Sequence, residues 1–321
     1  MFKSDWEKTD QLLKLDQNIL KEMIAQFFPR GNLISCQIIS GGCANLNSKI
    51  IVDGSIYILR VYLRDKDACY REQKLAALIK STIPIPEIYY ISKIENYQFS
   101  IIEYMEGITL RDLILNHPNE DIKPVMREVG LILANIKKYQ FLHAGFFGQD
   151  LKIKQKISKN EYIEFARNCL NNKIVQAVIS ERNIVHVNDC LNRYCNVLPE
   201  EPEHNLVHGD YDPANILVEE KEDKWKVSAI LDWEFAFSGS SLVDIANMVR
   251  YAHKLPSTFT ESFMLGLKEG GLILEDNWQT AVNLINLISL LELLTRSSLN
   301  QHPNRCKDLK ELIEYLIQQL R

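Results

Sequence analysis

The spacing of hydrophobic positions changes near residue 107 and divides the chain into two regions. In the first region, apolar side chains at helical spacing predict a leading helix over residues 5–28. Short runs of alternating and β-branched residues then predict five strands, at residues 33–39, 48–52, 56–62, 87–91 and 98–104. Residues 67–80 begin with a capping Asp and predict a helix beside them. This region therefore predicts a five-stranded antiparallel sheet with a packed helix.

After Gly107 the apolar spacing is almost entirely helical. Helices are predicted at residues 122–141, 160–183, 185–198, 241–253, 258–269, 276–298 and 305–321. Short strands around the chemical motif, at residues 207–218 and 225–231, interrupt them and are joined by an acidic turn. The pattern predicts an α+β protein with two lobes, residues 1–106 and 107–321, and a hinge near residues 103–107.

Composition and charge narrow the class of protein. A chain of 321 residues with 46% hydrophobic and 25% charged residues is typical of a soluble globular enzyme. The net charge of −5 disfavours nucleic acid as a partner, and the seven scattered cysteines indicate reduced thiols rather than a disulfide framework. The apolar run at residues 284–294 is too short for a bilayer and is interrupted by Asn286 and Glu292. We expect a cytoplasmic protein without a membrane partner.

Two short segments carry the candidate chemistry. Residues 208–215 read HGDYDPAN, and residues 230–234 read ILDWE. Asp210 is the candidate base that takes the proton of an acceptor hydroxyl during phosphoryl transfer. Asn215 and Asp232 offer the oxygen ligands that Mg²⁺ prefers. The segments therefore predict a magnesium-dependent phosphotransferase.

The same residue types are also common in surface turns, so the HGD triplet alone does not decide between the two interpretations. The strand that follows Asn215 and the strand that ends at Asp232 favour the functional one. His208 is expected to brace the loop through hydrogen bonds and not to act as the base.

The two segments resemble the aminoglycoside phosphotransferase and choline kinase family of small-molecule kinases. Its catalytic loop is H-G-D-x-x-x-x-N, and its metal-binding segment is a hydrophobic pair followed by D-W or D-F. The resemblance implies a protein-kinase-like bilobal fold with ATP or GTP and Mg²⁺ between the lobes. It also implies that the partner is a small molecule whose hydroxyl group accepts the phosphoryl group.

The resemblance extends to the nucleotide side of the site. It assigns Ser40, Gly41, Gly42 and Asn45 to a phosphate-covering loop, Arg60 to the α- and β-phosphates with Glu72 as its ion-pair partner, Ile102, Glu103 and Met105 to the purine, and Asp244 to the support of the catalytic loop. Arg60 stands where many kinases have Lys. The alternatives are an ordinary hairpin at residues 40–45, an exposed arginine at a strand end, and a helix N-terminal carboxylate at residue 244.

Charge gives a weaker indication of the acceptor. Residues 199–234 contain eleven acidic residues against three lysines, which favours an aminoglycoside-like or other amine-bearing acceptor. The candidate acceptor contacts are Asp212, Glu234, Glu275, Asp276 and Glu292. Kinases of choline, sugar or homoserine type and a nucleotide-binding pseudokinase are the alternatives. A protein kinase is disfavoured, because H-R-D, D-F-G and A-P-E segments are missing. The sequence contains no indication of oligomeric state.

Overall fold

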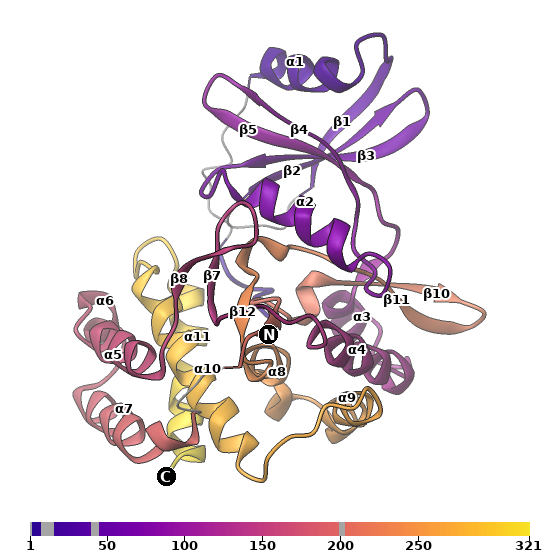
Figure 1. Cartoon of the computed structure of the whole chain (residues 1–321). Helices are drawn as coiled ribbons and strands as arrows, with labels where there is room; N and C mark the ends of the chain where they lie inside the picture. The colour runs from indigo at the N-terminus through magenta and orange to yellow at the C-terminus, as the bar shows by residue number, and fades with distance from the viewer. Residues whose placement is uncertain (1, 8–15, 40–44, 199–202) are drawn as a thin grey trace.

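The computed structural model describes residues 2–7, 16–39, 45–198 and 203–321, which form two lobes (Figure 1). The smaller lobe contains one antiparallel sheet in the order β1-β2-β3-β5-β4. Its strands are β1 (Leu33–Ile39), β2 (Asn45–Val52), β3 (Ser55–Tyr62), β4 (Ile88–Ile94) and β5 (Tyr97–Glu103). Figure 1 shows the helices α1 (Gln17–Phe27) and α2 (Ala68–Ile79) above and below this sheet. The predicted five-stranded sheet with its packed helix is confirmed.

The hairpin between β2 and β3 shows how the sequence fixes the register of this sheet. Val52 pairs with Ser55, so the turn consists of Asp53 and Gly54 alone. Both turn residues have positive φ angles, 50° and 83°, which is the backbone of the twisted two-residue hairpin that Asp-Gly favours. The register in turn sets which side chains of β3 face the other lobe.

The predicted leading helix is only partly correct. Helix α1 begins after Asp16, whose side chain accepts a hydrogen bond from the Asn18 N–H at 2.8 Å. Residues 5–7, which the prediction included, are not helical. Trp6 packs against the core of the larger lobe, so tertiary contacts outweigh the local helical pattern there.

The larger lobe is mostly helical, as predicted. Its helices are α3 (Leu110–Asn116), α4 (Lys123–Ile136), α5 (Lys159–Leu170), α6 (Lys173–Val178), α7 (Glu181–Tyr194), α8 (Leu242–Val249), α9 (Ser257–Glu269), α10 (Trp278–Thr295) and α11 (Pro303–Gln319). The single helix predicted at 160–183 is wrong, because the Asn172 side chain accepts the Ile174 N–H and begins a new helix. Among the described residues, no helix has the length and apolar character needed to cross a bilayer.

Short strands in the larger lobe surround the HGD segment. They are β6 (Ile108–Thr109), β7 (Gly145–Phe147), β8 (Ile153–Lys156), β9 (Asn205–Val207), β10 (Ile216–Lys221), β11 (Lys224–Ile230) and β12 (Phe237–Gly239). They form two sheets, β11-β10-β6 and β8-β7-β12-β9. The short strands predicted around the motif at 207–218 correspond to β9 and β10, and the HGD segment is the loop between them. Strands of two to four residues such as β6 and β7 are too short to produce a periodic signal.

Candidate active site

The HGD loop and Asp232 meet because β10 and β11 are antiparallel neighbours. Ile216 at the start of β10 pairs with Ile230 at the end of β11. The Leu231 N–H then donates to the Asn215 carbonyl oxygen at 2.8 Å. This ribbon places Asn215 and Asp232 at the same end, where the smaller lobe faces the larger one.

The start of the loop is held by the buried carboxylate of Asp244 on α8. Asp244 accepts hydrogen bonds from the backbone N–H groups of His208, at 2.7 Å, and Gly209, at 2.9 Å. Burial raises the pKa of Asp244 to about 7, although these two donors act in the opposite direction. Gly209 has a φ of 86°, and a Cβ added there would collide with the Phe235 carbonyl oxygen. The loop conformation therefore requires both the carboxylate and a glycine.

Replacing Asp244 by Ala should destabilise the fold, because two buried N–H groups lose their acceptor. We expect the free energy of unfolding to fall by about 3 kcal/mol. Urea unfolding of the wild type and the variant measures the difference. Asp223→Ala, a change at an exposed turn residue, is the control and should have little effect. Equal losses in the two variants would contradict the role given to Asp244.

His208 is fully buried and uses both ring nitrogens within the loop. Its Nδ1 accepts from the Asp210 N–H at 3.2 Å, so Nε2 carries the hydrogen and donates to the Leu231 carbonyl oxygen at 2.8 Å. Burial lowers the pKa of His208, which keeps the ring neutral. These contacts are the ones that a bracing role requires, and they leave neither nitrogen free to act as a base.

Asp210 lies between an amide and an ammonium group. Its Oδ2 accepts from the Asn215 Nδ2 at 3.0 Å, and its Oδ1 accepts from the Lys3 Nζ at 2.9 Å. Burial acts to raise the pKa of Asp210, but the charge and hydrogen bond of Lys3 lower it below its ordinary value. Asp210 is therefore ionised, as a proton acceptor must be. Because the Asn215 nitrogen turns toward Asp210, the amide oxygen faces the other way.

The predicted pair of Arg60 and Glu72 is present and also includes Asp232. Arg60 on β3 is 8% exposed, its Nη1 lies 3.5 Å from a Glu72 oxygen, and its Nη2 pairs with Asp232. Tyr62 donates its hydroxyl hydrogen to the second Glu72 oxygen at 2.6 Å. The interpretation of Arg60 as an exposed arginine is therefore wrong. The Arg60 guanidinium thus lies between Glu72 on α2 and Asp232 at the end of β11.

Of the residues predicted to form the phosphate-covering loop, only Asn45 belongs to the described part of the chain. Ser40, Gly41 and Gly42 lie outside the described residues. Asn45 donates from Nδ2 to Glu234 at 2.9 Å, and Glu234 is 6% exposed. Burial, with the nearby charge of Asp232, raises the pKa of Glu234 to about 7. Glu234, predicted as an acceptor contact, thus lies against the smaller lobe.

The segment predicted to bind the purine follows the sheet directly. Ile102 is buried at the end of β5, and the Glu103 N–H donates to the Glu87 carbonyl oxygen at 2.8 Å. Met105 lies in the irregular stretch that leads to β6. Glu103 and Met105 therefore lie where the chain passes from one lobe to the other.

The oxygen donors fit Mg²⁺ that arrives with a nucleotide. Asn215 and Asp232 supply an amide oxygen and a carboxylate, and Mg²⁺ is commonly held by one or two such groups together with phosphate oxygens. Across the residues that the structure describes, no group of three or more His, Cys, Asp or Glu could hold a metal ion. The donor set is thus too small for a metal held by the protein alone, and Arg60 balances the Asp232 charge in this structure.

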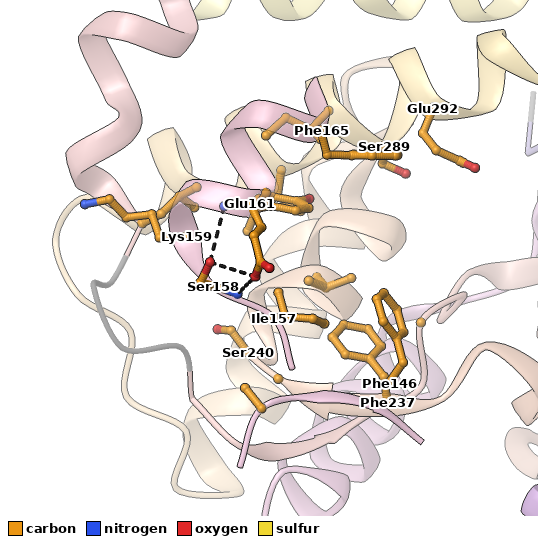
Figure 2. Close-up of a pocket in the computed structure, with 18 of the residues that line it drawn as sticks. Phe146, Ile157, Ser158, Lys159, Glu161, Phe165, Phe237, Ser240, Ser289 and Glu292 are labelled. Carbon is orange, nitrogen blue, oxygen red and sulfur yellow. Dashed lines mark hydrogen bonds between the residues drawn. The ribbon is translucent and has the colours of Figure 1, made fainter. Parts of the chain in front are cut away.

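A cavity of about 620 Å³ lies in the larger lobe beside the HGD loop (Figure 2). Its wall is mainly apolar and includes Phe146, Ile157, Tyr162, Phe165, Phe237, Ile285 and Ile288. The rings of Phe146 and Phe237 lie 5.7 Å apart at one side of it, and Ser289 and Glu292 line another part. The cavity reaches the backbone of Gly209, the residue before Asp210.

The predicted acceptor contacts are distributed over several places. Glu292 lines the cavity, whereas Glu275 and Asp276 are exposed before α10 and do not line it. Asp212 lies beside Asp210, and its Oδ2 is 2.6 Å from the Lys3 Nζ. The structure therefore brings Asp212 and Glu292 near the candidate site and leaves Glu275 and Asp276 outside it.

Sequence reasoning missed three polar residues of this region. No local sequence pattern links Lys3 to Asp210, because the two residues are 207 positions apart. Asn247 donates from Nδ2 to the Gly209 carbonyl oxygen at 3.1 Å. Arg250 is buried and donates to Asn286 and Ser289, each at 3.1 Å. The isolated Asn286 in the apolar α10 was the available signal, because a buried amide requires a partner.

Comparisons with known proteins identify the family and the fold of the chain. The sequence matches the family described as "Phosphotransferase enzyme family" over residues 35–281. A comparison with curated protein sequences finds no match. Among solved structures, aminoglycoside phosphotransferase APH(4)-Ia is similar, with a TM-score of 0.74 and 19% identity over 94% of this chain and 99% of that one.

Two liganded structures share the fold. One is a thermostable mutant of APH(4)-Ia in a ternary complex with AMP-PNP and hygromycin B, with a TM-score of 0.72 and 19% identity over 93% of this chain and 98% of that one. The other is the GDP and kanamycin complex of APH(2")-IIia, with a TM-score of 0.72 and 16% identity over 94% of this chain and 99% of that one. At these identities the likeness establishes the protein-kinase-like bilobal fold, as the sequence predicted.

Proposed function

Because the chain belongs to the phosphotransferase enzyme family, we propose that its site transfers the γ-phosphoryl group of ATP or GTP to a hydroxyl group of a small molecule. The observation that carries this proposal is the placement of Asp210, Asn215 and Asp232 at one end of the β10–β11 ribbon. Phosphoryl transfer depends mainly on alignment and on neutralising charge, and these residues supply a base and two oxygen ligands.

In this proposal each lobe binds a different substrate. Residues 1–106 hold the nucleotide, with Arg60 directed at the phosphates and Glu72 holding Arg60. Residues 107–321 hold the HGD loop and the acceptor. Asp210 accepts the hydrogen bond of the acceptor hydroxyl and takes its proton as the phosphoryl group arrives. Asn215 and Asp232 would hold Mg²⁺, which neutralises the phosphate charge when it is bound.

Two observations support an amine-bearing acceptor with an apolar body. The carboxylates of Asp210 and Asp212 already bind one ammonium group, that of Lys3, at 2.9 and 2.6 Å. The cavity beside them has a mainly apolar wall. Glu161, which also lines it, accepts hydrogen bonds from the Ser158 N–H and hydroxyl (Figure 2). An acceptor with one or a few amines fits this charge balance better than a polycation. A metabolite of choline, sugar or homoserine type is the second candidate.

The experiment is a panel of acceptors tested with ATP and with GTP in the presence of Mg²⁺. Aminoglycosides, macrolides, choline, homoserine and sugars cover the proposed classes, and nucleotide consumption is the readout. We expect turnover with at least one amine-bearing acceptor, together with a rise in melting temperature on adding a nucleotide. Absence of both effects would exclude the enzyme, and the temperature rise alone would support the pseudokinase.

The assignment of the cavity to the acceptor can be tested with Phe146→Ala. Removing the ring takes away apolar contact worth about 1.5 kcal/mol, so the KM for the acceptor should rise about tenfold while nucleotide affinity stays unchanged. Leu142→Ala is the matched control, because Leu142 is exposed on the same segment and does not line the cavity. An unchanged KM in Phe146→Ala would place the acceptor elsewhere.

A further inference from the structure

Residues 2–7 cross the larger lobe, and Lys3 within this segment contacts the HGD loop. The Phe2 ring packs against Tyr251, at 5.1 Å between ring centroids, and Phe259, at 6.3 Å. The Phe2 carbonyl oxygen accepts from the Arg111 Nη1 at 3.5 Å. The segment is therefore anchored at one end by a fully buried aromatic side chain.

The other end of this segment is anchored on α11. The Trp6 Nε1 donates to Asp308 at 2.9 Å, and the Arg305 guanidinium lies 4.9 Å from the centre of the Trp6 ring. The two carboxylate oxygens of Glu7 accept from the backbone N–H groups of Asn304, at 2.6 Å, and Arg305, at 3.2 Å, in the first turn of α11. These contacts hold residues 2–7 in one defined path over the lobe.

Between the two anchors, Lys3 points into the candidate active site. Its ammonium nitrogen lies 2.9 Å from Asp210 Oδ1 and 2.6 Å from Asp212 Oδ2. Burial acts to lower the pKa of Lys3, but the two carboxylates raise it above its ordinary value, so the ammonium keeps its charge. Lys3 thus covers the oxygen of Asp210 that Asn215 does not engage.

We propose that residues 2–7 are an intramolecular competitor of the acceptor, with the Lys3 ammonium in the place of an acceptor amine at Asp210 and Asp212. This inference rests on the proposed function, because it assumes that Asp210 receives the acceptor hydroxyl. An acceptor enters only when Lys3 leaves, and an acceptor with a primary ammonium group compensates the two carboxylates that Lys3 gives up. The Asp210–Asp212 pair is then a binding site for one alkylammonium group, used in turn by the chain and by its substrate.

The size of the effect follows from the fraction of molecules in which the segment is docked. If nine molecules in ten have Lys3 in place, the apparent affinity for a competing ligand is lowered about tenfold. Lys3→Met removes the ammonium and keeps most of the apolar stem. Magnesium-dependent hydrolysis of ATP and GTP without an acceptor should therefore become about tenfold faster in this variant. For an acceptor that the panel identifies, KM should fall by the same factor and kcat should stay unchanged.

Two further variants make this result specific to the ammonium of Lys3. Lys21→Met removes the same charge from the exposed face of α1 and should behave as the wild type. Lys3→Arg keeps a cation at the site and should retain most of the inhibition. Hydrogen exchange of residues 2–7 gives an independent measure of docking, and we expect it to be faster in Lys3→Met than in the other three proteins.

Different results would overturn the proposed competitor and the proposed function. Equal rates of hydrolysis in Lys3→Met and the wild type would overturn the proposal that residues 2–7 compete with the acceptor. Slower hydrolysis in Lys3→Met also overturns it, since Lys3 then assists catalysis. If all four proteins fail to consume nucleotide, the proposed function fails, and hydrogen exchange still shows whether the segment is docked.

Discussion

Replacing Asp210 by Asn should reduce the rate of phosphoryl transfer by about 10²–10⁴-fold and leave nucleotide binding intact. The amide has nearly the shape of the carboxylate, so the loop contacts to Asn215 and to the His208 ring can persist. The amide cannot take the proton of the acceptor hydroxyl. We therefore expect only the rate of the chemical step to fall. Initial rates and the dissociation constant of the nucleotide, measured on the same preparation, separate the two effects.

Asp223→Asn is the matched control for this change, because it alters an exposed acid in the turn between β10 and β11. It should retain the wild-type rate. If Asp210→Asn were as active as the control, Asp210 would not be the base, and the proposed chemistry would need another acceptor for the proton.

Replacing Arg60 by Met should affect both stability and nucleotide affinity. The change leaves the buried Glu72 carboxylate without its cation and removes the charge beside Asp232. Breaking a buried pair in this way lowers the free energy of unfolding by about 3–5 kcal/mol. We also expect the dissociation constant of the nucleotide to rise by about tenfold or more, because a charge directed at the phosphates is lost. Urea unfolding and nucleotide titration measure the two effects.

Arg30→Met serves as the control for the loss of a positive charge, since Arg30 is exposed between α1 and β1. It should change neither quantity. If Arg60→Met lowered stability and bound nucleotide normally, Arg60 would be a structural residue, and the assignment of the phosphates to its vicinity would be wrong.

The smaller lobe could be predicted from the sequence because its information is local. Alternating residues mark the strands, and Asp53 with Gly54 fixes a hairpin and its register. That register puts Arg60 in β3, where the chain continues into α2 with Glu72. The positions of Asp210, Asn215 and Asp232 were likewise visible, since each stands beside a short apolar strand.

The parts that could not be predicted depend on contacts between distant segments. Trp6 belongs to a pattern that is helical on its own, and Phe2 precedes that pattern. Their partners lie on α9, on α11 and in the turn after α8. The cavity wall combines side chains from β7, β8, α5, β12 and α10, and no single stretch of sequence shows it. Lys3 reaches Asp210 only because those contacts carry it across the lobe.

The most direct test of the proposed chemistry follows the γ-phosphoryl group itself. Wild-type protein is incubated with γ-labelled ATP or GTP, Mg²⁺ and the acceptor panel, and the products are separated and analysed by mass spectrometry. The proposal predicts label on a hydroxyl group of a small-molecule acceptor, dependent on Mg²⁺ and nearly absent with Asp210→Asn. Nucleotide binding with no labelled acceptor, or equal labelling by Asp210→Asn, would contradict it.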